Sequence, residues 1–307
     1  MEIPYTVRPR PDTGLANPKL GIWLFIASEV MLFGGLFAGY IFMRLGAEPW
    51  MWPHGWLNVP VGTFNTFILI ASSVTVILSW EALKMRNYKA FKTWLAITWI
   101  CGLAFLAVKL SYEWPAKFTH FGAYVKKEAA WKYEALLGNE DFTDAEGKTE
   151  DGYQTRKGYP RLFISGHPKD WADVKNPDVK EITLSAIDEE NHEPRSPAND
   201  KAHFIPRPMV HLHEGHEVKL NKADLLYGYG PFYPKLNTYL ACYFMITGLH
   251  GLHVLGGVLV FLFFWGPGSK LLKTNPEQLS NRIEVAGLFW HLVDLIWIFV
   301  FPIFYLL

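Results

Sequence analysis

The sequence of 307 residues contains only two cysteines, Cys101 and Cys242, and both lie in apolar segments. They form neither a C-x-x-C nor a C-x-x-C-H sequence, so we expect no disulfide framework, sulfur-ligated metal or covalently attached haem. No Gly-rich nucleotide loop and no nucleophile elbow occurs. The formal net charge is +0, which gives no basic excess for nucleic-acid binding. These absences indicate a chain that does no redox chemistry alone.

The first 18 residues lack an apolar core, so no cleavable signal peptide is expected. The rest of the chain is dominated by long apolar segments, five of which are long enough and poor enough in charge to cross a bilayer as helices. They are Leu20–Arg44, Pro60–Lys84, Lys92–Glu113, Asn237–Trp265 and Ile283–Leu307. Only helices satisfy the backbone of such segments in lipid. The predicted fold class is an all-α membrane protein, a bundle of five transmembrane helices.

The chain therefore divides into three predicted parts. Residues 1–113 form an N-terminal tail and three helices, residues 114–235 form a large extramembrane insertion, and residues 236–307 form the last two helices. Between Trp114 and Pro234 there are 16 Lys and Arg against 20 Asp and Glu, a net charge of −4. We expect a small domain or an irregular arm here, with a short helix at Ala129–Leu137 and a loop at Asp188–Lys201.

Positive charges lie on one side of the predicted bundle. The N-terminal tail and the second and fourth connections carry them, at Arg8, Arg10, Lys19, Lys84, Arg86, Lys89, Lys92, Lys270, Lys273 and Arg282. Because cytoplasmic loops are enriched in Lys and Arg, this side is predicted to be the cytoplasm. The insertion and the C-terminus would then face the periplasm of a bacterial plasma membrane.

Glu29 stands inside the first apolar segment, about 14 Å along the helix from its start. A charged group near the bilayer centre costs at least about 2.5 kcal/mol, so such a residue is rare unless it has a partner or a function. A proton relay and a neutral buried carboxyl both remain open for Glu29.

The last two segments carry further ionisable residues. Glu284, His291 and Asp294 are seven and three residues apart and share one helix face, while His250 and His253 are three apart. Histidines on two helices could ligate haem or copper. A polar network with Asp294 and Glu284, or a lipid headgroup site, is the favoured interpretation.

Other polar and small residues have structural interpretations. The hydroxyls of the second segment, including Ser72, Ser73 and Thr75, are expected to form hydrogen bonds between helices. The small-residue spacing of Gly34, Gly35 and Gly39 suggests close helix packing. Lys109 and Glu113 are expected to form an ion pair near the outer surface, with the lysine reaching toward water.

The insertion contains the sequence H-L-H-E-G-H, in which His211, His213 and His216 are weak candidates for a metal site. A solvated polar loop is favoured, because this spacing matches no common metal signature.

Four longer motifs carry a resemblance. They are S-E-V-M-L-F at Ser28–Phe33, N-T-x-I-L-x-x-S-S at Asn65–Ser73, T-G-L-H-G-L-H-V at Thr247–Val254 and F-W-H-L-V-D-L-I-W-I-F at Phe289–Phe299. In these motifs, and in the order of all five segments, the chain closely resembles subunit III of the haem-copper cytochrome c oxidases. It looks like a five-helix variant of that family, and the large insertion is a departure from it.

The resemblance implies a non-catalytic subunit of a proton-pumping terminal oxidase that reduces oxygen to water. It implies no cofactor in this chain, haems and copper in partner subunits, and bound phospholipid. Subunit I would be the direct partner, beside subunit II. Glu29 matches the carbodiimide-reactive carboxyl of the family, related to proton uptake. The resemblance assigns His250, His253, Glu284, His291 and Asp294 to helix packing and lipid association.

Some alternatives remain open at this stage. A b-type cytochrome or quinol-binding carrier would use His250, His253 and His291, and a related subunit III could belong to a quinol oxidase or nitric-oxide reductase. The insertion is expected to dock a partner subunit, a cytochrome c or a quinol-oxidising complex of a respiratory supercomplex.

Overall fold

The computed structural model describes residues 17–47, 52, 57–126, 129, 133, 162–185, 209–211, 217–226 and 229–306. The chain divides into two compact units. The first contains Met1–Ile41, His54–Glu113 and Tyr243–Leu307, and the second contains Phe42–Pro53 and Trp114–Cys242. The second unit thus holds the insertion, which we expected at residues 114–235, together with the connection after the first helix.

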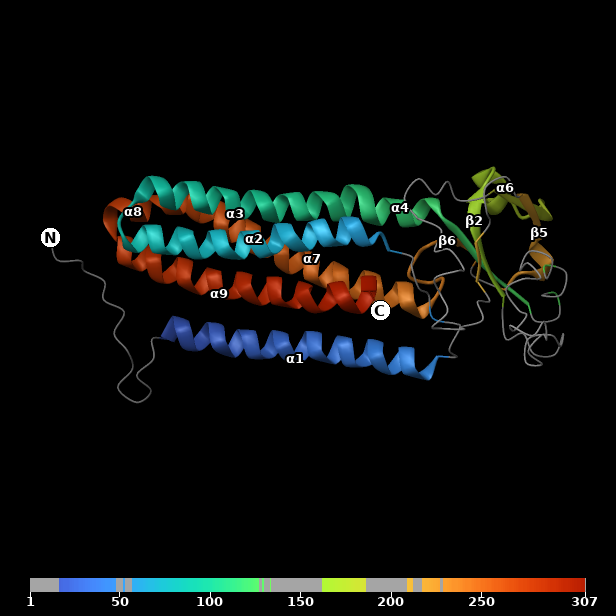
Figure 1. Ribbon diagram of the computed structural model, residues 1–307, viewed down its shortest axis with the longest axis horizontal. Coiled ribbons are helices and arrows are strands. Elements are labelled where there is room, and N and C mark those ends of the chain that lie inside the picture. Colours follow the sequence, from blue (N-terminus) through green and yellow to red (C-terminus); the bar gives the residue numbers. More distant parts are fainter. Residues whose placement is uncertain are drawn as a thin grey trace, which may run out of the picture. The chain divides into compact units, whose positions relative to one another are not determined.

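Within the described residues, five helices are long and apolar enough to cross a membrane, which confirms the prediction. They run alongside one another in Figure 1 and are labelled α1 (Asn17–Gly46), α2 (Val59–Lys84), α3 (Tyr88–Val108), α7 (Thr238–Trp265) and α9 (Pro276–Phe301). Short helical segments continue three of them: η1 (Lys109–Glu113) and α4 (Trp114–Thr119) after α3, η5 (Pro267–Lys270) and α8 (Leu271–Thr274) after α7, and η6 (Pro302–Leu306) after α9. Both η1 and η6 are π-helical turns.

Asparagine side chains fix where four of these helices begin, and at the start of α7 Asn237 accepts a hydrogen bond from the Leu240 amide. Asn58 accepts a hydrogen bond from the Val61 amide at the start of α2, Asn87 accepts from Ala90 at the start of α3, and Asn275 accepts from Gln278 at the start of α9. Asparagine is favoured at this position because it satisfies an amide that the first helical turn leaves without a partner.

Hydroxyl groups of α2 connect it to its neighbours, as the sequence predicts. Thr75 Oγ1 lies 2.8 Å from Thr98 Oγ1 of α3, and Ser72 Oγ accepts a hydrogen bond of 2.9 Å from the Trp290 indole of α9. Such contacts hold helices together in lipid, where apolar surfaces alone provide no preference for protein over acyl chains.

Helix α1 packs much more loosely than the other four. In its most apolar window 6% of the residues are buried, against 33–44% in the other spans, and its buried residues are Phe33 and Tyr40. A Cβ added at Gly34, Gly35 or Gly39 would meet nothing within 4 Å. The expectation of close packing at these glycines is therefore wrong within this chain, because their face of α1 points away from the other helices.

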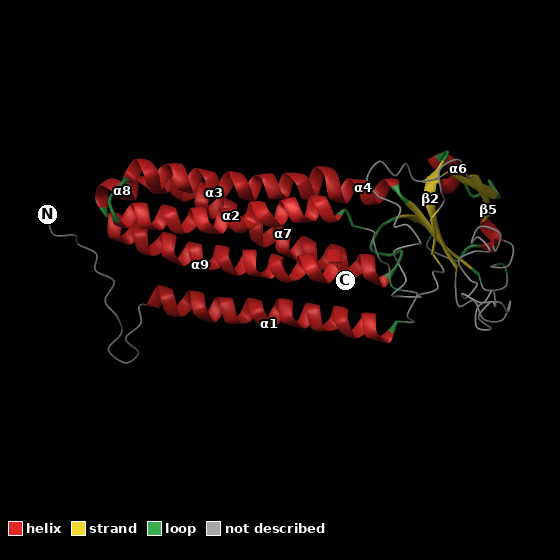
Figure 2. Cartoon of the chain, in the orientation of Figure 1, coloured by secondary structure: helices red, strands yellow, loops and turns green. Residues whose placement is uncertain are grey.

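The insertion contains a six-stranded sheet that the sequence analysis did not predict. The strands, shown in yellow in Figure 2, are β1 (Phe121–Val125), β2 (Leu162–Pro168), β3 (Glu181–Ser185), β4 (Met209–His211), β5 (Glu217–Asn221) and β6 (Gly230–Pro231). Their order is β5-β3-β2-β1-β6, with β4 paired in parallel to β2 and the other pairs antiparallel. Two short helical segments accompany them, α6 (Trp171–Lys175) and η4 (Lys222–Asp224).

The sheet has a hydrophobic core of its own. It includes Phe121, Ile164, Ile182, Leu184 and Leu220, each 0% exposed. The helix expected at Ala129–Leu137 lies outside the described residues except for Ala129 and Tyr133, and the loop expected at Asp188–Lys201 lies wholly outside them.

Candidate functional site

Glu29 of α1 lies against His253 of α7. Its Oε2 atom is 3.0 Å from Nε2 of the imidazole, and the two side chains are 13% and 16% exposed. The other ring nitrogen, Nδ1, is 2.8 Å from the carbonyl oxygen of Leu249, one turn earlier in α7. A carbonyl oxygen only accepts, so Nδ1 carries a proton. The contact between Nε2 and Glu29 then needs one further proton, held either by the imidazole as an ion pair or by the carboxyl group.

Two aromatic rings flank the imidazole of this pair. The ring of Phe33 meets the His253 imidazole edge-on at 5.5 Å between centroids, and Phe289 of α9 stacks on it at 6.2 Å. Apolar walls lower the local dielectric constant and strengthen the attraction between a carboxylate and an imidazolium. The arrangement therefore brings a carboxylate oxygen and an imidazole nitrogen into a contact between α1 and α7 that is mostly shielded from solvent.

A second polar contact joins α2 to α9. Ser73 Oγ lies 2.8 Å from Nδ1 of His291, and Asp294, 7% exposed, stands one turn further along α9. Its Oδ1 atom has no hydrogen-bond partner among the described residues. These residues share a helix face, as their spacing indicates, but they contact α2 and not the Glu29–His253 pair.

Glu284 has a different environment. Its carboxylate forms a salt bridge of 2.8 Å with Lys19 near the start of α1, and the two side chains are 25% and 43% exposed. Exposed pairs of this kind contribute little to stability, because solvent screens the charges.

His250 is fully buried and takes part in none of these contacts. Its ring lies 5.0 Å from Trp297 and 5.6 Å from Phe105, and neither ring nitrogen has a hydrogen-bond partner among the described residues. His250 and His253 are thus three residues apart but differ in environment. The structure places the five predicted residues of α7 and α9 in four separate settings rather than around one centre.

No three His, Cys, Asp or Glu side chains come together as metal ligands in the part of the chain that the structure describes. His211 is the last residue of β4, while His213 and His216 lie outside the described residues. Both ring nitrogens of His253 are in contact, with Glu29 and with the Leu249 carbonyl, so His253 is not free to ligate a haem in this arrangement.

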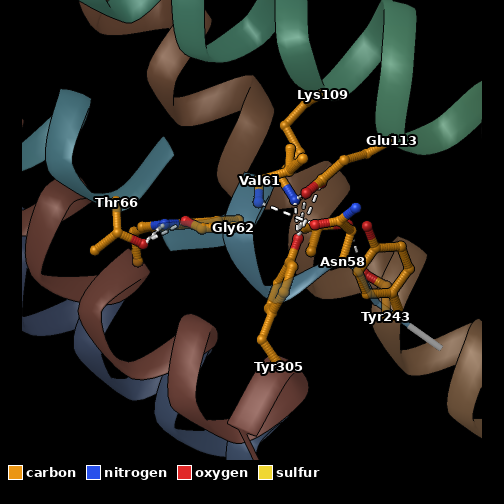
Figure 3. Close-up of polar contacts among 10 residues, drawn as sticks. Asn58, Val61, Gly62, Thr66, Lys109, Glu113, Tyr243 and Tyr305 are labelled. Atoms are coloured by element: carbon orange, nitrogen blue, oxygen red, sulfur yellow. Dashed lines mark hydrogen bonds and ion pairs between the residues drawn. The ribbon is translucent and has the colours of Figure 1, made fainter. Parts of the chain in front are cut away.

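One buried polar cluster was predicted only in part. Lys109 and Glu113 do pair, but they are 5% and 6% exposed instead of reaching toward water, and they join the phenol of Tyr305 beside the ring of Tyr243 (Figure 3). The π turn of η1 directs both side chains inward, and the apolar sequence around Tyr305 gave no sign of a polar contact.

Comparison of the sequence with known protein families gives a match that extends over most of the chain. The sequence profile described as "Cytochrome c oxidase subunit III" matches residues 12–125 and 224–307. The chain belongs to this family. The match covers all five membrane helices of this subunit III chain and leaves out most of the insertion.

Individual relatives support the assignment. The "Cytochrome c oxidase subunit 3" of Thermostichus vulcanus is 23% identical over 290 residues, which cover 94% of this chain and 86% of the relative. The "Quinol oxidase subunit 3" of Bacillus subtilis is 28% identical over 128 residues, 41% of this chain and 61% of the relative. The "Heme-copper oxidase subunit I+III" of Aeropyrum pernix is 35% identical over 102 residues, 31% of this chain and 12% of the relative. The chain is thus a multi-pass membrane protein of the subunit III family of haem-copper oxidases.

Proposed function

We propose that this chain is the third, non-catalytic subunit of a proton-pumping haem-copper oxidase and packs directly against subunit I, beside subunit II. The family match carries this proposal. The relative named as a fused subunit I+III supports the contact with subunit I, because it joins the two subunits in one polypeptide. Haems and copper would reside in the partner subunits. The relatives include both a cytochrome c oxidase and a quinol oxidase subunit. The electron donor, a cytochrome c or a quinol, is therefore to be identified from the partner subunits.

The Glu29–His253 pair would be the proton-related element of the subunit. It offers one proton position between an oxygen and a nitrogen that are 3.0 Å apart and mostly shielded from solvent. Such a pair suits a role in proton uptake, since carboxylate and imidazole groups commonly act as proton relays in membrane proteins. His250, His291 and Asp294 would serve helix packing, and Glu284 with Lys19 would contribute to phospholipid association at one end of the bundle.

The insertion would lie on the periplasmic side of a bacterial plasma membrane, with the N-terminus in the cytoplasm. The distribution of Lys and Arg supports this orientation. Its separate hydrophobic core suits a docking module for a partner subunit or for the electron donor.

The first experiment is gentle purification from the native membrane, with identification of the co-purifying chains by mass spectrometry. A large haem-copper subunit together with a copper-bearing subunit is the expected result. Recovery of this chain alone, carrying its own haem, would refute the proposal.

Glu29→Gln in the complete complex tests the proton role. We expect unchanged assembly and a shorter active lifetime or weaker proton pumping during turnover, because glutamine keeps the hydrogen bond to His253 but cannot exchange a proton. Glu81→Gln, at an exposed position of α2, is the matched control and should leave both properties unchanged. Loss of the subunit from the Glu29→Gln complex would show a structural role instead.

A further inference from the structure

A buried ammonium group lies where three helices of the bundle meet. Lys109 Nζ donates hydrogen bonds to Glu113 Oε2 and to the phenol oxygen of Tyr305, and the Tyr305 phenol lies 2.9 Å from both carboxylate oxygens of Glu113. Figure 3 shows these three side chains pointing toward one another. The lysine ammonium thus has an anion and a phenol as close partners, in a site from which water is almost excluded.

Aromatic rings complete the surroundings of the ammonium. Its nitrogen lies 4.5 Å from the ring centroid of Trp297, 5.0 Å from that of Tyr305 and 5.8 Å from that of Tyr243. Trp297 and Tyr243 are 0% exposed. A cation over the faces of desolvated aromatic rings is stabilised by their electron density, and the carboxylate of Glu113 balances its charge.

The backbone is shaped to form this site. Lys109 and Glu113 are the first and last residues of the π turn η1, and Tyr305 lies in the π turn η6. Single π turns within helices are rare and often occur at functional positions. Gly62 of α2 makes room for the tyrosine, since a Cβ at this position would stand 2.6 Å from two carbon atoms of the Tyr305 ring.

The residues of the site lie at the borders of the insertion in the sequence. Glu113 is the last residue of the first unit before the chain enters the second, and Tyr243 is the first residue after it returns. Tyr305 belongs to the last turn of the chain. The site therefore unites the point where the insertion leaves the helix bundle, the point where it returns, and the C-terminal turn.

We propose that Lys109, Glu113, Tyr243 and Tyr305 form a clamp, in which one buried ammonium group holds η1 and the first turns of α7 to the π turn η6. The first two of these segments flank the insertion and are called its stems. The stability that the clamp provides depends on the balance of its two charges. Removing one member of a buried ion pair leaves the other charge without compensation and lowers stability, whereas replacing both by apolar groups often leaves stability unchanged. The salt bridge of Lys19 and Glu284 lacks this property, because it is partly exposed.

The test uses the full chain in lipid nanodiscs and measures deuterium uptake by mass spectrometry with thermal unfolding. Lys109→Met should lower the unfolding midpoint by about 5–10 °C, the result of an uncompensated buried carboxylate. It should raise deuterium uptake in the peptides covering residues 105–119, 238–247 and 299–306, with little change at the opposite helix ends. Lys109→Met combined with Glu113→Leu should recover most of the lost stability.

Tyr305→Phe removes only the phenol oxygen and serves if Lys109→Met does not fold. It should raise uptake at both stems, although residue 305 is distant from each in sequence. Lys89→Met, at an exposed position of α3, is the matched control and should change the midpoint by about 2 °C or less. The proposal is overturned if uptake at residues 238–247 stays unchanged in Tyr305→Phe. It is also overturned if the double variant is as unstable as Lys109→Met.

Discussion

The helix bundle and the sheet of the insertion bury apolar side chains for different reasons. In the sheet, Ile182, Leu184 and Leu220 are fully buried, and their removal from water stabilises the fold. In the bundle, lipid is as apolar as the side chains, so burial alone selects no neighbour. There the selective contacts come from small and polar residues, such as Gly102 beneath Trp290 and Thr75 against Thr98.

This difference indicates which substitutions each region tolerates. The sheet should be sensitive to the loss of volume in its core, whereas the bundle should be sensitive to the gain of volume at its helix contacts. The two regions also form separate compact units, which suggests that damage in one need not reach the other.

The largest effect is expected from Leu184→Ala in β3. Leu184 is 0% exposed, and truncation of a buried leucine costs about 2–5 kcal/mol of unfolding free energy. We expect faster deuterium uptake in peptides from β2, β3 and β5 of the full chain, while α2, α3 and α9 keep their protection. Glu181→Ala, at an exposed position of the same strand, is the control. Equal loss of protection in the helices would show that the two regions unfold together.

A smaller effect is expected from Gly102→Ala in α3. The new Cβ would stand 2.5 Å from Cγ2 of Val258 and 2.7 Å from Cη2 of Trp290. Overpacking of this kind costs about 1–3 kcal/mol, which should appear as a lower midpoint of thermal unfolding by circular dichroism. Gly35→Ala, where nothing lies within 4 Å, should leave the isolated chain unchanged or slightly more stable. Similar losses in both variants would contradict the assigned role of small residues at contacts.

The five helices could be predicted because their signal is local. A long apolar run poor in charge indicates a membrane helix whatever it packs against. The strands of the insertion are much shorter, three to seven residues in β2, β3, β4 and β5. Two of them still carry a readable signal, since E-I-T-L-S in β3 and E-V-K-L-N in β5 alternate polar and apolar residues as half-buried strands do.

The contacts of the site depend on how helices turn relative to one another, which no single segment encodes. Glu29 and His253 are 224 residues apart, and their pairing requires one particular rotation of α1 beside α7. Tyr305 follows apolar residues and contacts Lys109 from the π turn η6, whose spacing differs from that of an α-helix. The ionisable residues could be recognised in the sequence, and so could the pair of Lys109 and Glu113, which lie four residues apart. The pairings between different helices could not.

The smallest effect is expected from Tyr133→Phe in the insertion. The Tyr133 hydroxyl donates to Asp224 Oδ2 at 3.1 Å and accepts from the Asn221 amide at 3.1 Å. Removing a hydrogen-bonding group of this kind costs about 1 kcal/mol. Burial is the main cause that raises the pKa of the Tyr133 phenol above its ordinary value of 10.0, and the nearby carboxylate of Asp224 adds to the shift. The native fold therefore favours the neutral phenol.

The sign of the pH dependence follows from this raised pKa. The stabilisation by neutral Tyr133 is fully present below pH 10, the ordinary pKa of tyrosine, and is lost as the pH rises through the higher pKa of the folded state. Deuterium uptake of peptides 162–185 and 217–226, corrected for the intrinsic exchange rate, should show the original chain losing its advantage over Tyr133→Phe above pH 10. Lysines that titrate near this pH are present in both chains. The difference in deuterium uptake between the original chain and Tyr133→Phe therefore reports on Tyr133 alone. A constant difference across this range would show that the fold does not hold the Tyr133 phenol neutral.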